Sequence, residues 1–181
     1  MNASKSSPFR GIGGIFLIGF MGSGKSYWGK KWAAINHLSF VDLDELIEKK
    51  AGRSIADIFE TWGEEHFRKL EAETLRSCAQ LEDTIIACGG GTPCFHENMP
   101  WMNDHGITIY LSATPTEILQ RVLGEQEKRP LIKTLNPEEI VLYTEKKLAE
   151  RAPFYQQAKL KLPSSLANEN TLTEIISTIT T

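Results

Sequence analysis

Gly19-Phe20-Met21-Gly22-Ser23-Gly24-Lys25-Ser26 is the stretch that decides the fold of this chain, and it fits the pattern G-x-x-x-x-G-K-S/T in full. It follows the apolar run at residues 15–18, which indicates a buried strand, and precedes residues 27–35, which indicate a helix. This strand–loop–helix order separates a phosphate-binding loop from a chance match. Glycines let backbone N–H groups turn inward, and the next helix points its positive end at the same place. The stretch therefore predicts a site for phosphate groups.

Two side chains in this loop have expected roles. Lys25 can reach the β- and γ-phosphates of a nucleotide, and the Ser26 hydroxyl can ligate Mg²⁺. A glycine-rich turn without a ligand is the competing interpretation. It is disfavoured because Lys25 and Ser26 both occupy the positions that the chemistry requires.

The bulk composition describes a globular chain. Its 181 residues suit a single domain, with 41% hydrophobic and 24% charged residues. The net charge of −3 predicts no nucleic-acid partner, and no apolar run reaches the length of a membrane span. The three cysteines, Cys78, Cys88 and Cys94, match no metal-binding spacing. We interpret them as reduced thiols and expect a cytoplasmic location.

The amino-terminal segment superficially resembles a secretory signal, since Lys5 and Arg10 precede an apolar stretch at residues 11–21. Cleavage there would destroy the phosphate loop, so this interpretation is rejected. Residues 1–10 are expected to be a short disordered lead-in.

Strand-length apolar runs alternate with helical patterns along the chain. This alternation favours a parallel α/β sheet that is covered by helices on both faces. The charged stretch at residues 124–135 has no clear period and is a candidate lid. Strands are expected at residues 15–19, 38–41, 84–88, 108–111 and 159–162, and helices at residues 25–36, 44–50, 54–62, 64–81, 115–123, 137–150 and 171–179.

Polar residues follow the ends of these strands, where ligands of parallel sheets bind. Asp42 and Asp44 flank Leu43 after the second strand, and in extended geometry both would point to one side. One carboxylate can hold Mg²⁺ directly or through water, and the other can accept a proton from a hydroxyl group. Capping of the following helix is an alternative role for Asp44.

Glycines and arginines complete the candidate site. The run Gly89-Gly90-Gly91 ends a strand and suggests close approach of a ligand, or else a tight turn before Pro93. Two converging arginines, Arg68 and Arg151, would select an acidic substrate. Arg129, in the candidate lid, could cover the transferred phosphoryl group. The four histidines are interpreted as surface or structural residues. Trp28, Trp32, Trp62 and Trp101 are interpreted as core and helix-packing groups rather than stacking platforms.

Together these motifs resemble the shikimate kinase family of nucleoside-monophosphate-kinase-like P-loop proteins. The resemblance extends from about residue 15 to residue 162. It rests on the phosphate loop, Val-Asp-Leu-Asp-Glu-Leu-Ile-Glu at 41–48, Phe-Arg-Lys-Leu-Glu at 67–71, Gly-Gly-Gly at 89–91, Arg-Pro-Leu at 129–131 and Arg-Ala-Pro-Phe-Tyr at 151–155.

The resemblance implies a single α/β kinase domain over residues 1–181, with a five-stranded parallel sheet of order 2-3-1-4-5, a substrate-binding region at 41–81 and a lid at 124–135. It implies transfer of the γ-phosphoryl group of ATP to the 3-hydroxyl of shikimate, on the pathway to chorismate and aromatic amino acids. It also implies a cytoplasmic monomer that uses ATP and Mg²⁺.

The resemblance assigns a role to each site residue. Gly22, Ser23, Gly24, Lys25, Ser26 and Tyr27 would wrap the phosphates, and Arg129 would meet ATP. Ser26 and Asp42 would support Mg²⁺. Asp44 would hold the reacting hydroxyl and act as its base, while Arg68, Arg151 and the Gly90 backbone would bind shikimate. Asp44, Lys25 and Arg129 are thus the expected catalytic residues.

Two features depart from the family pattern. Tyr27 stands where the family usually has a small hydroxyl residue, and residues 163–170 offer no assignable adenine contact. A gluconate-kinase-like enzyme and a non-catalytic nucleotide-binding module are the alternatives. The two arginines with the triple glycine favour shikimate over gluconate, and intact Lys25, Ser26, Asp42 and Asp44 argue against a degenerate module.

Overall fold

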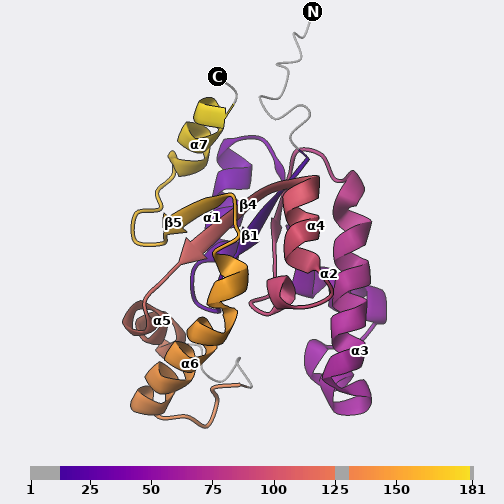
Figure 1. Cartoon of the computed structure of the whole chain (residues 1–181), viewed down its shortest axis with the longest axis vertical. Coiled ribbons are helices and arrows are strands. Elements are labelled where there is room, and N and C mark those ends of the chain that lie inside the picture. The colour runs from indigo at the N-terminus through magenta and orange to yellow at the C-terminus, as the bar shows by residue number, and fades with distance from the viewer. Residues whose placement is uncertain (1–12, 125–130, 180–181) are drawn as a thin grey trace, which may run out of the picture.

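We describe a computed structural model of the chain over residues 13–124 and 131–179 (Figure 1). The expected lead-in at residues 1–10 and residues 125–130 of the expected lid, Arg129 among them, lie outside this part. Within it, strands alternate with helices as predicted. The strands are β1 (Gly14–Ile18), β2 (Ser39–Asp42), β3 (Thr84–Ala87), β4 (Gly106–Ser112) and β5 (Leu160–Pro163), and the helices are α1 (Lys25–Ile35), α2 (Leu43–Ala51), α3 (Ile55–Ser77), α4 (Asn98–His105), α5 (Pro115–Val122), α6 (Pro137–Tyr155) and α7 (Thr171–Ile179).

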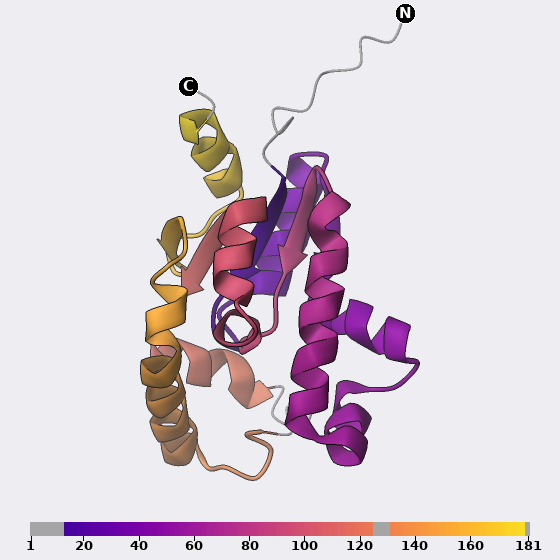
Figure 2. The same ribbon diagram turned by 45° about the vertical axis from the view of Figure 1, so that its right-hand side comes forward.

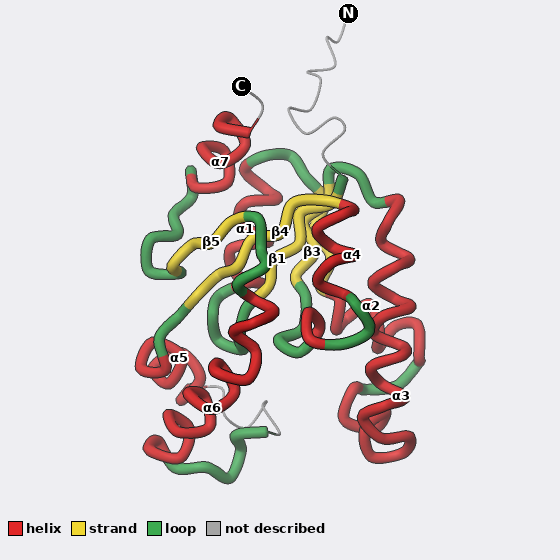
Figure 3. The backbone as a smooth tube through the Cα atoms, in the orientation of Figure 1, coloured by secondary structure: helices red, strands yellow, loops and turns green. Residues whose placement is uncertain are grey.

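The five strands form one parallel sheet in the order β2-β3-β1-β4-β5, which confirms the predicted topology. In the centre of the sheet, Phe16 of β1 pairs with Ile86 of β3 on one side and with Thr108 of β4 on the other. Because every strand runs the same way, all five carboxyl ends lie at one edge. The loops that leave these ends are therefore neighbours in space (Figure 3).

Alternation along β1 divides the core into two layers, because successive side chains of a strand point to opposite faces. Phe16 and Ile18 face a cluster that α2, α3 and α4 complete. Ile15 and Leu17 face the opposite cluster, where α1 contributes Trp32 and α7 contributes Leu172 and Ile176. Every residue of β1 is buried, as expected of a central strand in a doubly covered sheet.

Two pairs of helices extend beyond the carboxyl edge of the sheet, α5 with α6 on one side and α2 with α3 on the other (Figures 1 and 2). A separate small core joins the first pair to the phosphate loop, with Phe20, Ile118, Val122, Ile132 and Ile140 buried in it. The loops at the carboxyl edge thus lie between these two pairs of helices (Figure 2).

Polar side chains cap the starts of two helices. The Ser54 side chain accepts a hydrogen bond from Asp57 N at the start of α3, and Asn136 caps α6 in a reciprocal capping box with Glu139. The break expected after residue 62 is a kink inside α3 at Gly63, whose φ of 78° is left-handed. The helix expected to reach residue 81 ends at Ser77 and continues as a short 3₁₀ turn, Cys78–Gln80.

Helix α4 was not anticipated from the sequence. It contains Pro100 and has little amphipathic pattern, and its preceding residue, Glu97, has a φ of 54° and provides no side-chain cap. The tryptophan assignment was also partly wrong. Trp32 is fully buried, but Trp62 is 44% exposed and contacts His66 and Arg53.

Candidate active site

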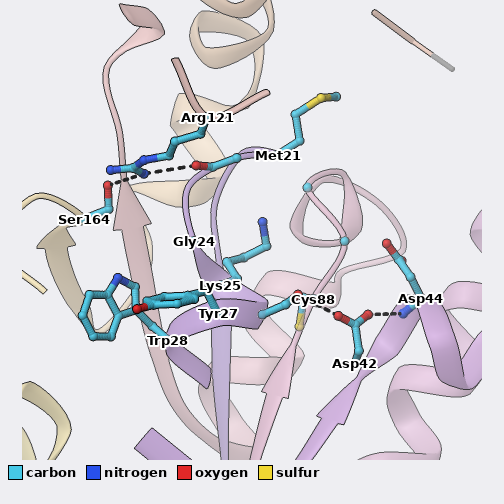
Figure 4. A pocket seen from close by; sticks show the side chains of 14 residues that line it. Met21, Gly24, Lys25, Tyr27, Trp28, Asp42, Asp44, Cys88, Arg121 and Ser164 are labelled. Atoms are coloured by element: carbon cyan, nitrogen blue, oxygen red, sulfur yellow. Dashed lines mark hydrogen bonds between the residues drawn. The ribbon is translucent and has the colours of Figure 1, made fainter. Parts of the chain in front are cut away.

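A cavity of about 630 Å³ opens at the carboxyl edge of the sheet, between the phosphate loop, the start of α2 and the turn after β3 (Figure 4). Most of the residues singled out from the sequence line it. They are Gly22, Gly24, Lys25, Ser26, Tyr27, Asp42, Asp44 and Gly90.

The phosphate loop wraps the start of α1. Gly24 has a φ of 95°, a left-handed conformation that glycine adopts without strain, and it precedes the first residue of the helix. Lys25 Nζ donates to the carbonyl oxygens of Gly19 at 2.8 Å and Phe20 at 2.9 Å, so the ammonium lies over the loop. The positive end of α1 and this ammonium favour an anion at the same point.

Ser23 differs from the other loop residues. Its side chain is fully buried, and its hydroxyl has no hydrogen-bond partner among the residues that the structure describes. Its backbone N–H donates to Phe20 O at 3.2 Å. Ser23 therefore shapes the loop from beneath and does not line the cavity.

Asp42 connects the phosphate loop to α2. Ser26 Oγ donates to Asp42 Oδ2 at 2.7 Å, and Asp44 N donates to Asp42 Oδ1 at 3.1 Å. The expected extended geometry from Asp42 to Asp44 is wrong, because α2 already begins at Leu43 and Asp42 is its N-cap. Capping, considered for Asp44, is thus carried out by Asp42. Asp44 instead lies in the first turn, and its side chain lines the cavity.

The Asp44 carboxyl group has a perturbed acidity. Burial, together with the negative charges of Asp42 and Glu71, raises the pKa of Asp44 from 3.8 to about 6. A carboxylate with this pKa is ionised at neutral pH yet accepts a proton more readily than an ordinary aspartate.

Each residue of the triple glycine makes room for a different charged side chain. A Cβ on Gly89 would lie 2.9 Å from Asp44 Oδ1, one on Gly90 would lie 2.9 Å from an Arg151 nitrogen, and one on Gly91 would lie 2.7 Å from an Arg68 nitrogen. Real Cβ atoms do not come this close to another heavy atom. The run therefore lets three charged groups from three helices converge on one backbone turn.

Arg68 is held by two glutamates. Its guanidinium donates to Glu71 Oε2 at 2.9 Å on one side and to Glu64 Oε1 at 3.0 Å on the other. Glu71 is 1% exposed and also accepts from Thr92 Oγ1 at 2.6 Å. Sequence analysis missed Glu71, although its position three residues after Arg68 on a helix is the spacing of an ion pair.

Arg151 lies near the end of α6, with its guanidinium 5.3 Å from the centroid of the Phe20 ring. Four residues on, the buried Tyr155 donates its hydroxyl to Gly90 O at 2.6 Å. This bond ties the end of α6 to the glycine turn that lines the cavity. Arg68 and Arg151 flank the cavity without lining it, whereas Arg129 lies outside the described residues.

Several cavity residues escaped sequence analysis. Arg121 of α5 donates to Gly22 O at 3.1 Å and to Ser164 Oγ at 2.9 Å, which joins the phosphate loop to the segment after β5. Arg121 and Ser164 both lie in stretches of sequence that carry no motif. Their contact becomes apparent only from the order of the strands in the sheet. Met21 also lines the cavity, as do Trp28 and Cys88, which the sequence analysis had interpreted as a packing group and a reduced thiol. Gly89 of the predicted glycine run lines it too.

Ser26 and Asp42 are the residues that fit Mg²⁺, since both present hard oxygen atoms within one hydrogen bond of each other. Across residues 13–124 and 131–179, no group of three or more His, Cys, Asp or Glu side chains is arranged to hold a metal by itself. A metal here would therefore share its coordination shell with phosphate and water. All three cysteines are unpaired, with Cys78 and Cys88 buried and Cys94 half-buried. None of the described helices is both long enough and apolar enough to cross a bilayer.

Comparison with known proteins decides the family. The shikimate kinase family model matches residues 21–180. The chain belongs to the shikimate kinase family. A shikimate kinase from Phocaeicola vulgatus is 41% identical over 145 residues, which cover 80% of this chain and 83% of the relative.

Solved structures agree with this family assignment. A shikimate kinase from Bacteroides thetaiotaomicron has a TM-score of 0.83 at 33% identity, covering 92% of this chain and 95% of that one. A shikimate kinase from Acinetobacter baumannii, solved in complex with shikimate, has a TM-score of 0.81 at 30% identity, with 94% of each chain covered. The predicted fold, family and enzyme class, an ATP-dependent shikimate kinase, are thereby confirmed, and the gluconate-kinase alternative is not supported.

Proposed function

We propose that the cavity at the carboxyl edge is the active site, where Asp44 presents the 3-hydroxyl of shikimate to the γ-phosphate of ATP. The observation that carries this proposal is the position of Asp44. Its carboxyl group, with a pKa raised to about 6, faces the same cavity as Lys25 of the phosphate loop.

The phosphate loop binds the nucleotide tail. The amides of residues 22–27 and the Lys25 ammonium receive the phosphate oxygens, and Lys25 leaves the Gly19 and Phe20 carbonyl oxygens to do so. Phosphoryl transfer has a loose transition state, so positioning and charge neutralisation lower most of the barrier. Mg²⁺ would be held by the Ser26 hydroxyl and, through water, by the Asp42 carboxylate. It would neutralise charge on the phosphates.

Asp44 orients the acceptor and takes its proton. Its burial and its acidic neighbours make the carboxylate a better base without protonating it at neutral pH. The carboxylate lies against Gly89, where a Cβ would come within 2.9 Å of Asp44 Oδ1, so the glycine leaves room for this carboxylate at the edge of the cavity.

The acceptor's own carboxylate is bound by the two arginines. Arg68 and Arg151 approach the adjacent glycines Gly91 and Gly90, so their guanidinium groups converge from α3 and α6. Bidentate guanidinium–carboxylate pairs give both affinity and orientation. Buried Glu71 holds Arg68 on the protein side. Glu64, whose side chain is 59% exposed, holds the guanidinium on the solvent side, where a substrate carboxylate would compete with it for hydrogen bonds.

The remaining expectations are also part of the proposal. Residues 41–81 serve as the substrate-binding region, and residues 124–135 serve as a lid that brings Arg129 to ATP. The protein acts as a monomer. The unpaired thiols support a reducing, cytoplasmic setting. The proposal includes no membrane or nucleic-acid partner.

An acceptor panel tests this function. ADP release from Mg-ATP is measured with shikimate, with gluconate and with no acceptor. We expect release that depends on shikimate alone. Equal release in all three reactions, or dependence on gluconate, would contradict the proposal.

A further inference from the structure

The turn that follows β3 contains a buried threonine that has no part in the proposed function. Thr92 comes directly after the triple glycine, begins the short 3₁₀ turn Thr92–Cys94 and is fully buried. Its hydroxyl donates to Glu71 Oε1 at 2.6 Å. Because threonine is branched at Cβ and has few χ1 rotamers, this hydroxyl stays in one place once the backbone is fixed.

The backbone of Thr92 is held from both sides. Its N–H donates to Gly89 O at 3.1 Å, and its carbonyl oxygen accepts from Asn98 Nδ2 at 2.8 Å. Asn98, the first residue of α4, is itself fully buried, and its Oδ1 accepts from Arg76 of α3. The Thr92 hydroxyl thus has a fixed position between α3 and α4.

Glu71 is the residue that this hydroxyl contacts, and its carboxylate is 1% exposed. Oε2 accepts from Arg68 Nη1 at 2.9 Å, whereas Oε1 accepts from Thr92. A Cβ on Gly89 would lie 3.2 Å from Oε1, so the glycine turn packs against this oxygen. A buried carboxylate oxygen that loses its donor is costly. Removal of the Thr92 hydroxyl would therefore favour another orientation of the Glu71 carboxylate.

Arg68 contacts the same turn directly. A Cβ on Gly91 would lie 2.7 Å from Arg68 Nη2 and 2.8 Å from Nη1, so the guanidinium lies against this backbone. Phe95, three residues after Thr92, has its ring centroid 4.3 Å from Arg68 Cζ. The turn after β3 therefore holds Arg68 in two ways, by packing on the guanidinium and by holding its buried ionic partner.

We propose that Thr92 is a positioning residue for the carboxylate of the acceptor. Its hydroxyl fixes Glu71, and Glu71 in turn orients the Arg68 guanidinium at the glycine turn, where Arg151 converges with it. This inference rests on the proposed function, because it requires that Arg68 binds the substrate carboxylate. A bidentate guanidinium–carboxylate pair needs a defined direction of the guanidinium donors, so a rotation of Arg68 weakens binding.

Substitutions at Thr92 test this role. Thr92→Val has nearly the same shape without the hydroxyl, and Thr92→Ser restores the hydroxyl. Thr74→Val is the matched control, because Thr74 is a buried threonine of α3 whose hydroxyl has no hydrogen-bond partner among the described residues. The KM for shikimate, the KM for ATP and kcat are measured at pH 8, well above the Asp44 pKa of about 6.

We expect Thr92→Val to raise the KM for shikimate about 10-fold, while the KM for ATP and kcat stay within about twofold of the wild type. Thr92→Ser and Thr74→Val should keep the wild-type KM. A wild-type KM for shikimate in Thr92→Val would overturn the proposal. An equal rise in both KM values would also overturn it, because that result indicates general damage to the fold. If Thr92→Val does not fold, Thr92→Ala removes the same hydroxyl and takes its place.

A double-mutant cycle with Glu71→Gln shows whether Thr92 acts through Glu71. The two residues share one hydrogen bond, so their effects should be strongly non-additive. We expect Thr92→Val to add little to the KM for shikimate that Glu71→Gln already has. Effects of the two substitutions that multiply in the double variant would overturn the proposal, since Thr92 would then act by another route.

Failure of this inference is distinguishable from failure of the proposed function. A wild type that shows shikimate-dependent ADP release, with a Thr92→Val variant of unchanged KM, would remove the role of Thr92 alone. A wild type without shikimate-dependent release would remove the proposed function and this inference with it.

Discussion

Ser26 Oγ donates a 2.7 Å hydrogen bond to Asp42 Oδ2. This bond connects the last residue of the phosphate-loop motif to the last residue of β2. The two residues are 16 positions apart and come from opposite sides of β3 in the strand order. This pair supplies both oxygen donors that we assign to Mg²⁺.

Asp42→Asn tests the metal assignment. Asn caps a helix as well as Asp does, so α2 should remain folded, but the negative charge near the metal is lost. We expect the Mg²⁺ concentration for half-maximal turnover to rise about 10- to 100-fold. Glu45→Gln, an exposed carboxylate in the same helical turn, serves as the control. An unchanged Mg²⁺ requirement in Asp42→Asn would remove this residue from the metal site.

Asp44→Asn tests the base. The variant should bind ADP normally but lose turnover by about 10²- to 10⁴-fold, the range for loss of a positioned acid–base group. In the wild type, kcat/KM should fall about tenfold per pH unit below about pH 6, because protonated Asp44 cannot accept the substrate proton. Turnover of Asp44→Asn equal to that of the wild type in a coupled assay would exclude the assigned role.

The same substitution should change stability in a pH-dependent way. Because the folded pKa of Asp44 lies above 3.8, the folded chain binds this proton more tightly than the unfolded chain does. The carboxyl group therefore favours folding at low pH, and this contribution is lost as the pH rises through 6. Asp44→Asn should be more stable than the wild type at pH 8, by at most about 3 kcal/mol, and the difference should shrink toward pH 4. Guanidinium unfolding at both pH values measures it, and a difference independent of pH would contradict the raised pKa.

Glu71→Gln, compared with Glu64→Gln, distinguishes the role of the buried partner of Arg68 from that of its exposed partner. The Glu71 charge helps to raise the pKa of Asp44, so its removal should shift the acid limb of kcat/KM to lower pH. The KM for shikimate should also rise, because Arg68 loses the carboxylate that fixes it from behind. Glu64→Gln is the control, since Glu64 holds the same arginine from solvent and should neither shift the limb nor raise KM. Identical profiles for the two variants would show that burial of Glu71 has no special role.

Most strand and helix positions could be predicted because their determinants are local, whereas the sheet order came from the family resemblance. The apolar run of β1, the caps at Ser54 and Asn136 and the phosphate-loop pattern are all readable within a few residues. Helix α4 was missed because tertiary packing of Met99 and Met102, and not its own periodicity, holds it in place.

The site was only partly predictable for the same reason. Asp42 and Asp44 were found as a pair, but their relation was wrong, because the helix begins one residue earlier than an extended strand end would suggest. Glu71, Arg121 and Ser164 gain their importance from partners on other elements, such as Thr92 for Glu71 and Gly22 for Arg121. Single-sequence patterns do not reveal such partners.

A crystal structure with Mg-ADP and shikimate tests the central claim most directly. The account predicts the phosphates on the amides of residues 22–27, with Lys25 Nζ moved from the Gly19 and Phe20 carbonyl oxygens onto phosphate oxygens. It predicts the shikimate 3-hydroxyl within hydrogen-bond distance of Asp44, and the shikimate carboxylate between Arg68 and Arg151. A nucleotide bound elsewhere, or shikimate in the cavity with its 3-hydroxyl turned away from Asp44, would contradict it.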